Sequence, residues 1–102
     1  MKFSFNGNSR YPTLSLEGEF DTSDWEAALE HIEPIIMEEN SRVDVDLSCL
    51  QTIDSSGLSA LIHLVSRARM RGAEVALVSP TPFVRGVMEV TRLDSFFLIE
   101  GP

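Results

Sequence analysis

The chain has 102 residues, of which 43% are hydrophobic and 24% charged, and its formal net charge is -8. This length fits one domain over residues 1–102, and the acidity disfavours nucleic acid and anionic lipid as partners. No apolar run approaches the roughly 20 residues that span a bilayer, and the N-terminus lacks the long apolar segment of a signal peptide. The single cysteine, Cys49, can form neither an intramolecular disulfide nor a cysteine-based metal site. We therefore expect a cytoplasmic protein without direct membrane insertion, in which Cys49 is a small packed residue.

The N-terminal residues favour two strands. Residues 2–6 and residues 13–20 each alternate apolar and polar side chains, the pattern of a half-buried strand. Residues 7–12, between them, include Gly, Asn, Ser and Pro, which favour a turn. The sequence therefore predicts that the two strands pair as a hairpin.

A helix is predicted after this hairpin. Ser23 followed by Glu26 matches a capping box, in which the two side chains bond backbone amides and begin a helix. Apolar residues then recur at helical spacing, and we expect Trp25 to anchor this helix in the core. Pro34 removes a backbone donor and crowds the preceding turn, which predicts a kink or a break near Glu33.

The middle of the chain favours a strand and a long helix. Residues 42–50 form the predicted strand, with the valines on one side and the aspartates on the other. The helix that follows is expected to end near Gly72, which suits a C-terminal cap, and its arginines complement the helix dipole. Leu64 lies at the edge of the apolar stripe and would add to a partner surface if exposed, whereas Met70 and Met88 are expected to pack. The stripe consists of Leu58, Leu61, Ile62, Val65 and Ala68.

The C-terminal part repeats the pattern of strand, helix and strand. Residues 73–79 form a mostly apolar strand, Thr81 caps the next helix, and residues 95–100 form the last strand. The buried side of that helix is expected to comprise Phe83, Val84, Val87, Met88 and Val90. The resulting order, β-β-α-β-α-β-α-β, predicts an α/β domain with an N-terminal hairpin, a mixed but mainly parallel sheet and about three helices.

The residues Asp54, Ser55, Ser56 and Gly57 stand where a strand gives way to a helix. Backbone amides at a helix start lack intrahelical partners and favour Asp, Ser and negative charge. A phosphate on a serine would be accommodated there, and it would add about 1.5 to 2 negative charges to an acidic surface. These four residues alone favour the simpler explanation, a helix cap followed by a glycine for close packing.

Three ordered segments, covering nearly the whole chain, resemble the STAS domain family. They are LEGEFDTSDWEAALEHI (Leu16–Ile32), VDVDLSCLQTIDSSGLSALIHL (Val43–Leu64) and RGAEVALVSPTPFVRGVMEVTRLDSFFLI (Arg71–Ile99). They are similar to the family's second strand, turn and first helix, to its central strand and signature loop, and to its closing strand-helix-strand. The family includes bacterial anti-sigma factor antagonists and the cytoplasmic tails of sulfate transporters, so the resemblance implies a single STAS domain.

The resemblance also implies a function. In the antagonists, the first serine after the Asp of the signature loop is phosphorylated by a partner serine kinase that is also the anti-sigma factor. That position is Ser55 here. The resemblance implies that the unphosphorylated protein binds the kinase, which releases a sigma factor, that phosphorylation ends binding, and that a phosphatase resets the switch. The implied docking surface is bordered by Asp21, Asp54, Ser56, Gly57, Leu58 and Ser59.

The sequence departs from the antagonists in two places. It has no room for the further helix that many of them carry after the last strand, and Arg92 stands where they often have Gly. A short STAS protein of similar build is a subunit of a bacterial phospholipid-transport ABC complex, caps the transporter ATPase and typically has Thr at the position of Ser55. Other members are scaffolds in stress-signalling assemblies. The alternative expectation is a constitutive subunit in which Ser55 is only a cap and a contact.

Catalysis is not expected. Ser55, Asp54 and His63 are the residue types of a nucleophile, acid and base, but His63 would lie about 12 Å from Ser55 along a helix. The sequence has no nucleophile elbow, no Gly-rich phosphate-binding motif and no pair of nearby histidines that could bind a metal. We therefore expect a protein that is not an enzyme, holds no cofactor or metal, and presents His63 at its surface or to a partner.

Overall fold

A five-stranded sheet and three α-helices make up the fold in the computed structural model, which describes residues 2–7 and 10–101. Asn8 and Ser9 of the predicted turn lie outside the described residues. The elements in chain order are β1 (Lys2–Asn6), β2 (Thr13–Glu17), α1 (Trp25–Ile36), β3 (Arg42–Asp46), α2 (Ser55–Met70), β4 (Glu74–Val78), α3 (Pro82–Val90), the 3-10 helix η1 (Leu93–Ser95) and β5 (Leu98–Glu100).

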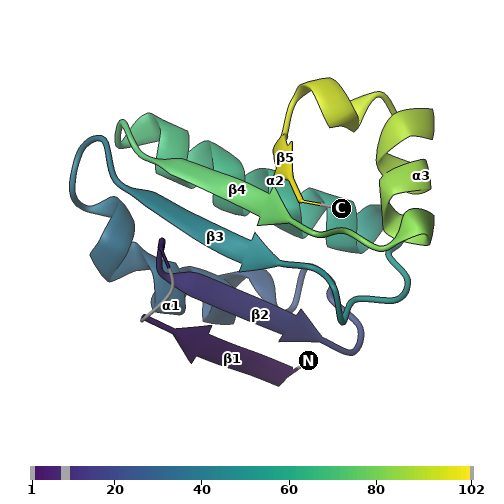
Figure 1. Ribbon diagram of the computed structural model, residues 1–102, viewed down its shortest axis with the longest axis horizontal. Coiled ribbons are helices and arrows are strands. Elements are labelled where there is room, and N and C mark those ends of the chain that lie inside the picture. The colour runs from purple at the N-terminus through teal and green to yellow at the C-terminus, as the bar shows by residue number, and fades with distance from the viewer. Residues whose placement is uncertain (1, 8–9, 102) are drawn as a thin grey trace.

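The strands follow one another across the sheet in the order β1-β2-β3-β4-β5. Only β1 and β2 are antiparallel, and the other three pairs are parallel and joined by helical crossovers. Figure 1 shows α1 and α2 behind the sheet, while α3 stands at the end toward which β3 and β4 point. The expected order of elements and the mixed, mainly parallel sheet are therefore confirmed.

The core lies between one face of the sheet and helices α1 and α2. Alternation along β2 and β3 directs every second side chain to this face, as a strand's period of two requires. The apolar stripe of α2 packs against it, and Leu64 belongs to this stripe because it is fully buried. The fully buried large side chains include Leu14, Leu16, Ile32, Ile36, Val43, Val45, Leu47, Leu50, Leu61, Leu64, Leu77 and Met88.

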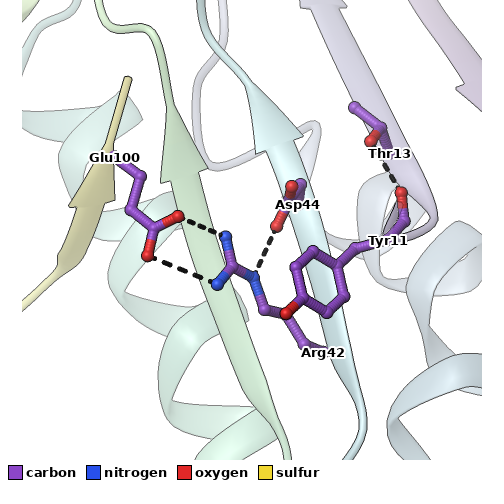
Figure 2. A network of polar contacts seen from close by, with 5 residues as sticks. All are labelled: Tyr11, Thr13, Arg42, Asp44 and Glu100. Atoms are coloured by element: carbon purple, nitrogen blue, oxygen red, sulfur yellow. Dashed lines mark hydrogen bonds and ion pairs between the residues drawn. The ribbon is translucent and has the colours of Figure 1, made fainter. Parts of the chain in front are cut away.

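The opposite face of the sheet carries no helix in Figure 1, and a charged network covers part of it. The guanidinium of Arg42 on β3 donates to Asp44 at 2.8 Å and to Glu100 on β5 at 2.8 and 3.3 Å, and it lies 4.2 Å from the ring centre of Tyr11 (Figure 2). The pair with Glu100 crosses β4, where Ala76 is fully buried although no helix covers it. The hydrogen bonds from Arg42 to Glu100 raise the pKa of Arg42.

The predicted capping box at Ser23 is wrong. Helix α1 begins at Trp25, and its N-cap residue, Asp24, makes no side-chain bond to the helix amides. Ser23 instead directs both its amide and its hydroxyl to the carboxylate of Asp21. The break expected near Glu33 is also absent, because α1 continues through Pro34.

Three predicted strands differ from the structure by three residues or more at one end. β2 ends at Glu17, where Gly18 takes a positive φ of 100°, and β3 ends at Asp46. The last strand begins only at Leu98, because the chain first forms η1. The predicted end of α2 and start of α3 agree with the structure. Gly72 has a φ of 75°, and the hydroxyl of Thr81 accepts from an amide of α3.

Several side chains expected in the interior lie at the surface. Phe83 and Val90 of α3 are 56% and 85% exposed, and Met70 is 83% exposed. Cys49 is exposed as well. Trp25 is half-buried and packs against the core from its edge. In the part of the chain that the structure describes, no helix is both long and apolar enough to cross a membrane.

Candidate functional site

The sequence motif at Asp54 lies at the carboxyl end of the sheet, where the connection after β3 enters α2. Asp54 has an extended backbone, and its carboxylate accepts a hydrogen bond of 2.9 Å from the amide of Gly57. This bond satisfies one of the amides that a helix start leaves without a partner. Ser55 is the first residue of α2, so the helix backbone holds the position from which its side chain projects.

The two adjacent serines have different environments. The hydroxyl oxygen of Ser56 accepts from the amide of Thr22 at 2.9 Å and donates to the hydroxyl of Thr22 at 3.2 Å. These bonds join the start of α2 to the loop between β2 and α1. Ser55 is exposed, and its hydroxyl makes no hydrogen bond within residues 2–7 and 10–101. Ser56 therefore has a structural role that explains its presence, whereas Ser55 is available for modification or contact.

Gly57 is required by close packing. A Cβ atom at this position would lie 2.4 Å from the carbonyl oxygen of Phe20 and 2.7 Å from a side-chain carbon of Ile53. Gly57 is buried, and so is Leu58, which is 6% exposed. These two residues are packed in the interior beneath Ser55, and they do not form part of the exposed surface of the site. Ser59, one turn after Ser55, is half-buried and borders that surface.

Asp21 organises the neighbouring loop. Its carboxylate accepts hydrogen bonds from the hydroxyl and the amide of Ser23, and these bonds lower the pKa of Asp21. Its own amide donates to the carboxylate of Asp24 at 3.1 Å. The structure therefore brings the Asp21 loop beside Asp54 and Ser55, as the resemblance implied. Their direct link, between Thr22 and Ser56, had no signal in the sequence.

A cleft of about 190 Å³ separates the two loops. Three carboxylates and no basic side chain are among its lining residues, which are Glu19, Phe20, Asp21, Thr52, Ile53 and Asp54. Across the described ranges of the chain, no three His, Cys, Asp or Glu side chains are grouped so that they could hold a metal ion. The cleft therefore presents negative charge beside Ser55.

His63 lies on the exposed side of α2, two turns beyond Ser55. Its ring stacks on Trp25 with centres 5.1 Å apart and an angle of 28° between the planes. The pair joins the first turn of α1 to α2. The sequence placed His63 at the surface correctly, but it expected Trp25 to anchor α1 to the sheet and did not indicate that Trp25 would meet this histidine.

The fold and the position of the Asp54 motif define a STAS domain. A family model described as "Mlab, STAS domain" matches residues 3–100, so the chain belongs to the STAS domain family. No curated protein sequence matches the chain.

The solved structures of TM1081 and of the anti-sigma factor antagonist SpoIIAA are similar in fold to this chain. TM1081 of Thermotoga maritima is 20% identical, with a TM-score of 0.79 over 99% of this chain and 82% of its own. The antagonist SpoIIAA in unphosphorylated form is 20% identical, with a TM-score of 0.70 over 97% of this chain and 88% of its own. The phosphorylated form of SpoIIAA from Bacillus is 20% identical, with a TM-score of 0.67 over 97% and 91% of the two chains.

Proposed function

We propose that this protein is an anti-sigma factor antagonist controlled by phosphorylation of Ser55. The unphosphorylated protein binds a serine-kinase anti-sigma factor in the cytoplasm, the kinase phosphorylates Ser55, and the complex dissociates. A phosphatase then restores the binding form. In this function the protein is a substrate and a binding module, and it has no active site, cofactor or metal of its own.

The contrast between Ser55 and Ser56 is the observation that carries the proposal. A kinase needs a hydroxyl that can enter its active site, and Ser55 is exposed and makes no hydrogen bond among the described residues. The hydroxyl of Ser56 is held by Thr22. The amides at the start of α2 favour a phosphate on Ser55. SpoIIAA, which shares the fold, has been solved in both an unphosphorylated and a phosphorylated form.

The added charge explains how binding would end. A phosphoserine carries about -1.5 to -2 at neutral pH. It would stand beside a cleft whose three carboxylates have no basic side chain among them. A partner that fits the neutral hydroxyl would meet both the bulk and the concentrated negative charge of the phosphate. The domain itself would stay folded because the Ser55 hydroxyl makes no hydrogen bond with the described residues that the phosphate must break.

A second candidate function is supported by the family model, whose description is "Mlab, STAS domain" and not that of an antagonist. In this alternative the protein is a constitutive subunit of a larger complex, such as a phospholipid-transport ABC complex or a stress-signalling scaffold. Ser55 would then be a contact at the interface with a transporter ATPase or a scaffold subunit. No phosphate would be found on it in cells.

The two functions are separated by one capture experiment. Wild-type protein and the variants Ser55→Ala, Ser55→Asp and Ser4→Asp are immobilised, exposed to host lysate and analysed by mass spectrometry. Ser4→Asp is the charge control, because Ser4 is an exposed serine on β1, at the far edge of the sheet. We expect a histidine-kinase-like ATPase to be retained by wild type, Ser55→Ala and Ser4→Asp, and to be lost with Ser55→Asp.

The chemistry is then tested with the purified ATPase. Incubation with ATP should add one phosphate, located on Ser55 by peptide fragmentation, and none to Ser55→Ala. Retention of a transporter ATPase in place of the kinase would support the constitutive subunit. Equal retention of every protein by wild type and Ser55→Asp would refute the switch.

A further inference from the structure

Helix α3 has two apolar stripes: one is fully buried in the core, and the other contacts the core only through the half-buried Val87. Val84 and Met88 are fully buried. The second stripe has the spacing i, i+3, i+4, i+7 of a helix that binds another surface, and it faces outward. Its ends are Phe83 and Val90, which are 56% and 85% exposed. The exposed ends of this stripe are not explained by the packing of the core.

The outward stripe forms an apolar groove of about 400 Å³, lined by Pro82, Phe83, Gly86, Val87, Val90 and Thr91. Gly86 leaves its floor open, because a Cβ atom there would meet no atom within 4 Å. Every lining side chain is uncharged. This exposed apolar surface is accessible to another molecule.

The groove adjoins the Ser55 site through one loop. The hydroxyl of Thr81, directly before α3, donates to the carbonyl oxygen of Leu50 at 3.2 Å. Leu50 belongs to the connection between β3 and α2, and Thr52 and Asp54 of the same connection line the acidic cleft. Figure 1 shows α3 and this connection at the same end of the sheet. The acidic cleft, Ser55 and the apolar groove are therefore neighbouring parts of one end of the molecule.

We infer that the groove on α3 is the apolar half of the surface that binds the anti-sigma factor, an inference that rests on the proposed function. The partner's matching surface has a protruding apolar side chain next to basic side chains. The apolar side chain enters between Phe83 and Val90, and the basic groups face the carboxylates of the cleft. This charge complementarity disfavours a second copy as the occupant, because each copy carries a net charge of -8.

The two halves contribute differently to binding. Burial of apolar side chains in a desolvated groove supplies affinity and slows dissociation. Exposed carboxylates such as Glu19 chiefly accelerate the encounter with a basic partner. A phosphate on Ser55 would stand directly after Asp54 of the acidic cleft and would repel the part of the partner that docks there.

The test measures binding of the ATPase that wild type retains and Ser55→Asp does not, purified and titrated by calorimetry. Val90→Asp places a charge in the groove, and Gly86→Leu fills it without a charge. Met70→Asp is the matched control, because Met70 is 83% exposed at the opposite end of α2. We expect at least tenfold weaker binding for Val90→Asp and Gly86→Leu, and less than a twofold change for Met70→Asp. Thermal unfolding of each variant confirms that the fold is intact.

A kinetic measurement examines the acidic half. Glu19→Gln should slow association about twofold to fivefold with little effect on dissociation, and Glu38→Gln, at the other end of α1, should change neither. If Val90→Asp and Gly86→Leu bind the ATPase as wild type does, the groove lies outside the interface and the inference fails, while the proposed function stands. If no retained ATPase is sensitive to Ser55→Asp, both fail. A wild-type dimer in sedimentation velocity that Val90→Asp dissociates would assign the groove to a second copy and overturn the inference.

Discussion

The helix-free face of the sheet and the end that carries Ser55 are both acidic, but only on the face are carboxylates paired with a cation. On the face, one guanidinium, that of Arg42, is bonded to the two carboxylates of Asp44 and Glu100. At the end, the carboxylates of the cleft have no basic side chain beside them, the Ser55 hydroxyl has no partner in the described chain, and an apolar groove is open.

This difference distinguishes groups that stabilise the fold from groups that remain available to a partner. Paired charges and satisfied hydrogen bonds account for their residues within the fold. At the Ser55 end, Asp21 and Asp54 accept hydrogen bonds from neighbouring residues, but no cation is among the residues that line their cleft. Carboxylates without a cation and neighbouring exposed apolar side chains are features of surfaces that bind other molecules. Substitution of a residue that is packed or bonded within the fold should lower stability, whereas substitution of Ser55 should not.

The largest loss of stability is expected at Gly57, on which the Ser55 site is built. Gly57→Ala places a methyl group 2.4 Å from the carbonyl oxygen of Phe20, so the Asp21 loop or α2 must move. We expect the free energy of unfolding, measured in urea, to fall by about 1–3 kcal/mol. The matched control is Gly86→Ala, a helical glycine with open space around it, which should be neutral or stabilising by up to about 1 kcal/mol. Equal effects at the two glycines would contradict the tight contact.

The next effect is expected on the helix-free face. Arg42→Met keeps an apolar stem but removes both ion pairs, and it leaves Asp44, whose side chain is only 15% exposed, without its cation. Unfolding in urea should require about 1–2 kcal/mol less. Arg71→Met is the control, because its pair with Glu33 is more exposed, at 39% and 30%, and should be worth less than about 0.5 kcal/mol.

A smaller effect should distinguish the two serines. Ser56→Ala removes both bonds to Thr22 at an exposed position, so we expect a loss of about 0.5–1 kcal/mol. Ser55→Ala removes no hydrogen bond in the described structure and should not destabilise. The same urea titration measures both variants. A larger loss for Ser55→Ala would show that its hydroxyl supports the fold, and it would weaken the case for a switch.

The sequence predicted well the secondary structure that carries the site, because these elements depend on local sequence patterns. A few neighbouring residues determine each of its parts: the apolar alternation of β3, the N-terminal cap of α2 at Asp54 and the end of α2 at Gly72. The same local rule failed at Ser23, where the carboxylate of Asp21 competes for the serine.

Features that depend on distant residues could not be predicted. Helical periodicity finds the apolar positions of α3, but it does not show that two stripes exist and that Phe83 and Val90 face outward. Arg42 and Glu100 are 58 residues apart and meet only because β4 lies between their strands. The link between Thr22 and Ser56 spans 34 residues in the same way.

The smallest effect concerns pH and tests whether the charges on the helix-free face are paired as drawn in Figure 2. The hydrogen bonds from Arg42 lower the pKa of Glu100 below its ordinary value of 4.5. Because the folded pKa is depressed, the pair stabilises the protein above the unfolded pKa, and this contribution is lost as the pH falls through the folded pKa. The difference in Tm between wild type and Glu100→Gln should therefore be constant down to about pH 5 and shrink below it. Glu89→Gln, whose carboxylate makes no hydrogen bond or ion pair with the described residues, should follow wild type throughout. A difference that persists unchanged at low pH would mean that the side chain of Glu100 stabilises β5 by packing and not through its charge.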